Sequence, residues 1–174
     1  IPKPFLTADF TSNYRMNTDN VADICIDMDG QLWMCSFPQG LTIRNDSYPN
    51  FNWVKRSLIK SNTLNNNSVD CIIEDSDRDL WYATDNGISL YERKSKKWHT
   101  MLSIADESIN KNHYFLTLCE VKPGIILAGG YAAGIYVIYK HSKETHFIRP
   151  NLMFPEKYIQ TMFLDKYDNT IWMG

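Results

Sequence analysis

Val69-Asp-Cys-Ile72-Ile-Glu74-Asp75-Ser-Asp77-Arg-Asp-Leu80-Trp81 decides the fold, because the chain of 174 residues contains four versions of this stretch. The other versions begin at Val21, Phe115 and Ile159, and the one at Phe115 diverges most. One position of the repeat holds Trp33, Trp81, Leu127 and Trp172, so it recurs after 48, 46 and 45 residues. Self-similarity at a period of this size is typical of solenoids, propellers and repeat arrays.

Within each repeat, apolar and polar residues alternate with a period of two, and Gly, Asn, Asp and Ser interrupt the runs. This pattern predicts short antiparallel strands joined by tight turns. In the first repeat we expect turns at 27–30 and 38–40, a third strand at 41–44 and a fourth at 52–56. Four strands in 45 to 48 residues is the size of one propeller blade.

We therefore predict an all-β fold, an arc of four-stranded antiparallel β-propeller blades that is a fragment of a larger propeller. The expected units are the end of a preceding blade at 1–20, blades at 21–68, 69–114 and 115–158, and the start of a further blade at 159–174. Closure needs roughly four blades, so the remaining blades should come from the same protein or from another copy.

The recurring large apolar residue has a mechanical explanation. A blade is a sheet that buries both faces against its neighbours. A large aromatic side chain on the second strand supplies apolar surface for the contact with the next blade. We expect packing between blades for Trp33, Trp81, Leu127 and Trp172.

Bulk composition excludes several classes of protein. The net charge is −2 with acids and bases mixed along the chain, which does not suit a nucleic-acid binder. The longest apolar run, 124–139, is shorter than the roughly 20 residues of a membrane helix.

The chain has four cysteines, none of which forms a close pair in sequence: Cys25, Cys35, Cys71 and Cys119. We expect buried free thiols, although a bridge from Cys71 to Cys25 or Cys119 stays open in an oxidising compartment.

No metal, cofactor or catalytic group is predicted. Asp75 to Asp79 begins like a calcium loop, but Leu80 and Asn86 occupy the positions that need Gly and Glu. A hairpin turn whose carboxylates accept backbone N–H groups explains it better. The glycine-rich segment 129–134 lacks a following Lys-Ser/Thr, so close backbone packing between strands is expected rather than a phosphate site.

A ligand site remains possible in the loops. In a propeller, the turns after the second and fourth strands meet around the central mouth, and binding residues concentrate on such loops. Asn and Asp with exposed aromatic residues would suit a sugar, although Asn-rich loops are also good turn formers. The candidate ligand-binding residues are Phe37, Gln39, Asn66, Asn67, Asp85, Asn86, His113, Tyr114, Tyr131 and Tyr158.

The string Val-x-x-Ile-x-x-Asp-x-x-Gly-x-Leu-Trp, followed by Asn-Gly-Ile/Leu, resembles the two-component regulator propeller repeat. That repeat occurs in the periplasmic sensor region of Bacteroidetes hybrid two-component histidine kinases. Residues 69–91 fit best, 21–43 and 159–174 fit well, and 115–136 fit loosely because Leu127 replaces Trp and Val121 replaces Asp.

The resemblance implies a non-enzymatic sensor segment in the periplasm, within a membrane-anchored and homodimeric parent kinase. Such a segment binds a small soluble ligand, usually a carbohydrate breakdown product such as an oligosaccharide, and passes a conformational signal inward. Two alternatives stay open. A propeller-fold polysaccharide lyase or hydrolase would need clustered acids, His or a metal at the mouth, and a protein-interaction platform would need an exposed apolar patch.

Overall fold

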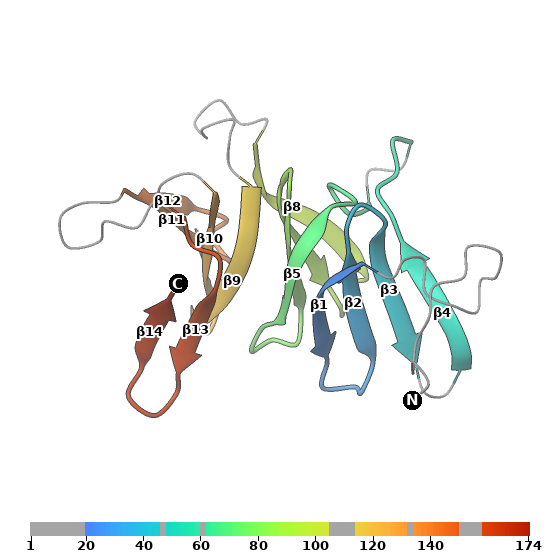
Figure 1. Ribbon diagram of the computed structural model, residues 1–174, viewed down its shortest axis with the longest axis horizontal. Coiled ribbons are helices and arrows are strands. Elements are labelled where there is room, and N and C mark those ends of the chain that lie inside the picture. The colour runs from blue at the N-terminus through green and yellow to red at the C-terminus, as the bar shows by residue number, and fades with distance from the viewer. Residues whose placement is uncertain (1–19, 46–47, 60–61, 105–113, 132–133, 150–157) are drawn as a thin grey trace.

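The computed structural model describes residues 20–45, 48–59, 62–104, 114–131, 134–149 and 158–174, and every regular element in these ranges is a β-strand. The strands form three four-stranded antiparallel sheets and one hairpin, each in chain order (Figure 1). This architecture confirms the predicted arc of four-stranded antiparallel propeller blades.

The first sheet contains β1 (Val21–Ile26), β2 (Leu32–Ser36), β3 (Gly40–Asn45) and β4 (Tyr48–Val54). The second contains β5 (Val69–Glu74), β6 (Leu80–Thr84), β7 (Gly87–Glu92) and β8 (Lys97–Ser103). The third contains β9 (Tyr114–Lys122), β10 (Ile125–Tyr131), β11 (Ile135–Tyr139) and β12 (Thr145–Ile148). The last hairpin joins β13 (Met162–Asp165) to β14 (Thr170–Met173).

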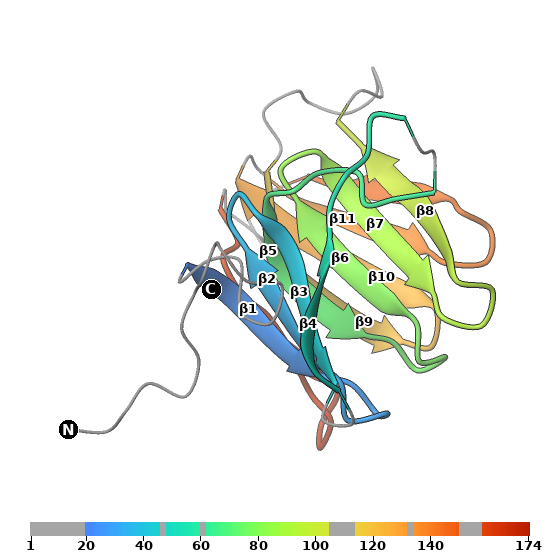
Figure 2. The same cartoon turned by 90° about the vertical axis from the view of Figure 1, so that its right-hand side faces the viewer.

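The sheets stack face to face, with the first strand of each beside the first strand of the next. β1 contacts β5, β5 contacts β9 and β9 contacts β13, and Figure 2 shows the first sheet in front of the second and third. This is the radial order of propeller blades, in which the first strands lie innermost.

Two strand boundaries differ from the sequence prediction. The fourth strand of the first sheet is β4, which begins at Tyr48 and ends at Val54 instead of covering 52–56. Gly129 and Gly130, which we expected between strands, belong to β10 at a shift of its register with β9. Both errors arise because glycine and asparagine are strand breakers by propensity, whereas pairing with a neighbouring strand overrides propensity.

Apolar side chains fill each junction between sheets. Trp33 is buried between the first two sheets, where its ring lies 6.2 Å from that of Tyr82. Trp81 is buried between the second and third sheets, and Leu127 between the third sheet and the last hairpin. Trp172, for which we expected the same packing, is 62% exposed, because no described sheet covers its face of the hairpin.

The opposite end of the arc is also open. Ile24 in β1 is 63% exposed, whereas the equivalent Ile72 in β5 is only 4% exposed. The difference arises because Ile72 faces the first sheet, while no described sheet faces Ile24.

A carboxylate at the first turn fixes the first sheet to the second. Asp27 Oδ1 accepts the main-chain N–H groups of Asp29 and Gln31 at 3.0 and 2.9 Å. Asp27 Oδ2 accepts the indole N–H of Trp33 at 2.7 Å and a guanidinium N–H of Arg93, from the second sheet, at 3.0 Å. These bonds to the charged form outweigh the burial that would raise the pKa of Asp27, so its pKa lies below the ordinary value.

The same arrangement recurs one repeat later. Asp75 Oδ1 accepts the N–H groups of Asp77 and Asp79, as the predicted hairpin turn requires. Asp75 Oδ2 accepts the indole N–H of Trp81 at 2.7 Å and the ammonium of Lys140, from the third sheet, at 2.6 Å. Lys140 Nζ also lies 2.9 Å from Asp77 and 2.8 Å from Asp79. The carboxylates that resembled a calcium loop therefore gather around a lysine. We call each set of turn aspartate, tryptophan and cation a junction clasp.

Lys140 offers a direct test of the junction clasp. Burial acts to lower the pKa of its ammonium, but the bonds to Asp75, Asp79 and Asp77 outweigh burial and raise it. Lys140→Met should lower the free energy of unfolding by about 3 kcal/mol, because it leaves buried carboxylates without their cation. Urea unfolding measures this loss. Lys122→Met, at an exposed position of the same sheet, is the control and should change stability by less than about 0.5 kcal/mol. Equal effects of the two substitutions would contradict the clasp.

Candidate functional site

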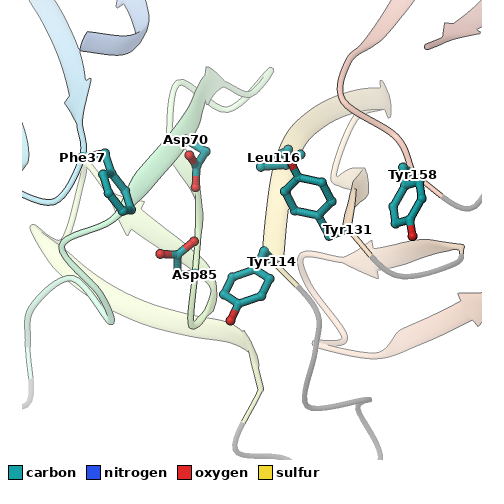
Figure 3. Close-up of a pocket in the computed structure, with 7 residues that line it drawn as sticks. All are labelled: Phe37, Asp70, Asp85, Tyr114, Leu116, Tyr131 and Tyr158. Carbon is teal, nitrogen blue, oxygen red and sulfur yellow. The ribbon is translucent and has the colours of Figure 1, made fainter. Parts of the chain in front are cut away.

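A cavity of about 660 Å³ opens where the first strands begin and the second strands end. This volume is ordinary for a small-molecule site. We call the cavity the mouth pocket, and Figure 3 shows its lining side chains, which are Phe37, Asp70, Asp85, Tyr114, Leu116, Tyr131 and Tyr158. They come from all three sheets and from the segment before β13, so the pocket exists only because the sheets stack in order.

Three tyrosines form one wall of the mouth pocket. Tyr114 begins β9, Tyr131 ends β10 and Tyr158 precedes β13. The rings of Tyr114 and Tyr131 lie 6.5 Å apart at 80°, and those of Tyr131 and Tyr158 lie 5.9 Å apart at 70°. Such edge-to-face contacts hold each ring at a defined angle. All three rings remain 46–59% exposed, so their faces are open to a ligand.

Two glycines in β10 make this wall possible. A Cβ added to Gly130 would lie 1.8 Å from the carbonyl oxygen of Tyr114, and one added to Gly129 would lie 2.9 Å from the side chain of Ile159. The Gly130 carbonyl oxygen accepts the N–H of Ile159 at 3.1 Å. The glycines therefore let three segments approach closely enough for their tyrosines to meet. The register shift between them turns the end of β10 toward the pocket.

Two carboxylates lie opposite the tyrosine wall. In Figure 3, Asp70 lies above Asp85, and both lie between Phe37 and the tyrosines. Burial first, and the neighbouring charge of Asp85 second, raise the pKa of Asp70 to about 6. Oδ2 of Asp70 is buried and has no hydrogen-bond partner among the described residues. A half-buried carboxylate without a counterion is a feature of binding and catalytic sites.

Five of the ten candidate ligand-binding residues line the mouth pocket, namely Phe37, Asp85, Tyr114, Tyr131 and Tyr158. Gln39 is half-buried in the turn after β2 and lies outside the lining. His113 lies outside the described residues.

The three asparagines among the candidates stabilise turns. Asn66 Oδ1 accepts the N–H of Ser68 at 2.9 Å, and Asn67 Oδ1 accepts the N–H of Arg56 at 2.7 Å. The N–H of Asn86 donates to Thr84 Oγ1 at 3.1 Å. Asn86 also lines a second, more polar groove beside the segment 56–65. For the side chains of Asn66 and Asn67, these bonds agree with the alternative expectation of a structural role in the loops.

Two lining residues were missed by the sequence analysis. Asp70 is the second residue of β5 and Leu116 the third residue of β9, so both lie in strands rather than in loops. Asp70 did carry a signal, because it is the one charged residue in the apolar run from Val69 to Ile73. A charge in an innermost strand must face the axial space or find a partner.

The described part of the chain holds no group of three or more His, Cys, Asp or Glu side chains that could bind a metal ion. All four cysteines are free, and three are buried. Burial first, and nearby Asp23 second, raise the pKa of Cys71 to about 12, so this thiol is unreactive at neutral pH.

Within the described ranges, no helix has the length and apolar character needed to span a membrane.

Comparison with known proteins supports the repeat. Residues 63–86 match the family described as two component regulator propeller, which confirms the resemblance at the best-fitting repeat. No curated protein matches the chain.

Solved structures share the fold. The extracellular domain of BT3049, assigned as a hybrid two component system of B. thetaiotaomicron, superposes with a TM-score of 0.76 at 16% identity over 88% of this chain and 21% of that chain. The corresponding domain of BT4673 superposes with a TM-score of 0.70 at 17% identity, over 91% of this chain and 20% of that chain. An ancestral GH74 enzyme superposes with a TM-score of 0.65 at 11% identity, over 89% of this chain and 22% of that chain. The chain spans about a fifth of the length of these proteins, and identities this low show the fold alone.

Asp70 gives the protein a characteristic pH dependence. Between its unfolded pKa near 3.8 and its folded pKa of about 6, the folded state binds more protons than the unfolded state, so stability falls as pH rises through this window. Asp70→Asn should therefore gain stability at pH 7.5 and almost none at pH 4. The full pKa shift of Asp70 corresponds to about 3 kcal/mol of folding free energy. Because the side chain is partly accessible to solvent, the expected gain in stability of Asp70→Asn is about 1 kcal/mol. Urea unfolding at both pH values measures it, and an equal change at the two values would contradict the assignment.

The close packing around Gly129 and Gly130 predicts how substitutions at these positions change stability. Gly130→Ala should lower the free energy of unfolding by about 2 kcal/mol or more, because the new methyl group meets main-chain atoms that cannot move away. Gly129→Ala should cost less, since its new methyl group would lie 2.9 Å from side-chain atoms of Ile159 and not 1.8 Å from a main-chain oxygen. Thermal unfolding of the two variants compares them, and the reverse order would refute the close approach of β9 and β10.

Proposed function

We propose that the chain is the ligand-sensing part of an extracytoplasmic propeller in a hybrid two-component sensor histidine kinase, and that the mouth pocket binds a small carbohydrate breakdown product. The observation that carries the proposal is the mouth pocket itself, where exposed aromatic faces and carboxylates from successive sheets converge. The matched repeat at 63–86 and the extracellular two-component domains that share the fold support it.

A sugar suits this pocket on physical grounds. A pyranose ring offers one apolar face of C–H groups and a rim of hydroxyls. The faces of Tyr114, Tyr131 and Tyr158 provide an apolar platform, and carboxylate oxygens accept hydrogen bonds from hydroxyls strongly. Fixed polar groups in a mainly apolar cavity are the usual composition of a small-molecule site.

The position of the pocket suits a sensor. Its residues belong to different sheets, so one ligand contacts the second sheet through Asp85 and the third through Tyr131. A ligand shifts a conformational equilibrium only if it binds one state better than the other, and contacts that span a junction meet this condition. The proposal places the chain in the periplasm, with the remaining blades of the same protein against the open faces of the arc and with a homodimeric, membrane-anchored parent.

A propeller-fold polysaccharide hydrolase or lyase is the second candidate. The Asp70 and Asp85 pair favours it, because paired carboxylates are the usual acid and base of glycoside cleavage. The similarity to an ancestral GH74 enzyme is a similarity of fold. It is not evidence that Asp70 and Asp85 are catalytic. We rank the enzyme second because the repeat match points to two-component propellers.

Calorimetric titration of the whole extracytoplasmic region with a panel of oligosaccharides tests the first candidate. At least one should bind, and Tyr131→Ala should weaken that binding about tenfold, or ~1.4 kcal/mol, because the central ring of the wall is lost. Tyr167→Ala is the matched control, since Tyr167 is fully exposed in the turn between β13 and β14, and it should leave the affinity unchanged.

Two results would contradict the sensor proposal. Affinity that is unchanged in Tyr131→Ala would place the ligand elsewhere. Release of shorter products from a polysaccharide, abolished in Asp85→Asn, would establish the enzyme instead.

A further inference from the structure

Three carboxylates at the junctions between sheets have cationic partners within the chain. Asp27 and Glu74 pair with Arg93, and Asp75 pairs with Lys140. Each of these cations reaches a carboxylate of the preceding sheet. At these two turns, acids that are shielded from water are therefore neutralised by a cation of the chain.

The mouth pocket departs from this pattern. Asp70 and Asp85 are the charged members of its described lining, which holds no lysine, arginine or histidine. Their mutual repulsion is unrelieved, and Oδ2 of Asp70 lacks a hydrogen-bond donor among the described residues. Two adjacent carboxylates with open aromatic faces opposite them form a receptor for a cation.

We infer that the ligand of the mouth pocket carries a positive charge and is an amino sugar with a free, protonated amine. This inference rests on the proposed carbohydrate function and names the class of sugar. An ammonium between Asp70 and Asp85 supplies the missing donor and counterion, while the sugar ring lies against Tyr114 and Tyr131. Uronate and sulfated sugars are repelled by the carboxylates, and an N-acetylated sugar lacks the charge.

Ionisation supports the inference at neutral pH. Burial and the charge of Asp85 raise the pKa of Asp70 to about 6, so the carboxyl is mainly ionised at pH 7.5. Binding of a cation removes the repulsion that raises this pKa. The energy of that repulsion, which is a cost in the free protein, is recovered when the cation binds.

A pair of disaccharides tests the charge directly. The β-1,4 disaccharide of glucosamine and its N,N′-diacetyl form differ only in acetylation of the amines. Calorimetry on the whole extracytoplasmic region at pH 7.5 should show at least tenfold tighter binding of the free amine. Asp70→Asn and Asp85→Asn should each remove most of this preference, while Tyr131→Ala should weaken both sugars. Asp168→Asn, in the turn between β13 and β14, is the matched control and should keep the preference. Thermal melting verifies that each variant is folded.

The outcomes separate the charge from the sugar. Equal or tighter binding of the acetylated form, or of a uronate disaccharide, overturns the inference. If neutral sugars bind through Tyr131 and the amine gives no advantage, the inference fails and the proposed function stands. If the diamine putrescine binds through Asp70 and Asp85 while no sugar binds, the cation site stands and the carbohydrate function fails. Absence of binding by every probe overturns both.

Discussion

The junction clasp is the interaction on which the rest of the structure depends. One oxygen of Asp27 or Asp75 closes its own turn, and the other holds the indole of the same sheet and a cation of the next. A single carboxylate therefore fixes the turn, the orientation of the tryptophan and the distance between two sheets. Removing the cation leaves a shielded charge unpaired, so at these two junctions the three features support one another.

The mouth pocket lies at the other end of the same strands. β5 begins beside Asp70 and ends at the turn of Asp75, so the clasp holds one end of the strand while the pocket occupies the other. This division explains how exposed tyrosines and an uncompensated pair of acids are tolerated. The clasps and the apolar junctions supply stability, and the pocket carries features that cost stability and that the proposed function assigns to binding.

The repeat in the sequence was enough to predict the blades, because period, alternation and tryptophan spacing are local signals. Half of the candidate ligand residues line the mouth pocket, since Phe37 and Tyr131 lie where second strands end. Asn66 and Asn67 lie outside this lining, and the sequence could not separate the two roles because a turn and a sugar site favour the same residue type. Asp70 was missed because it lies within a strand. The pairing of Asp27 with Arg93 spans 66 residues, and no local pattern predicts such a contact.

The contrast between the two ends of β5 bears on signalling. At the clasp end, Asp75 pairs with Lys140 of the third sheet. At the mouth end, the junction between the same two sheets has carboxylates on one side and tyrosines on the other, with no described cation to join them. A ligand that bridges them therefore adds a contact that depends on the angle between the sheets. Since the clasp holds one end, that angle is the coordinate that the proposed ligand would bias, and its free energy of binding would then be coupled to the arrangement of the propeller.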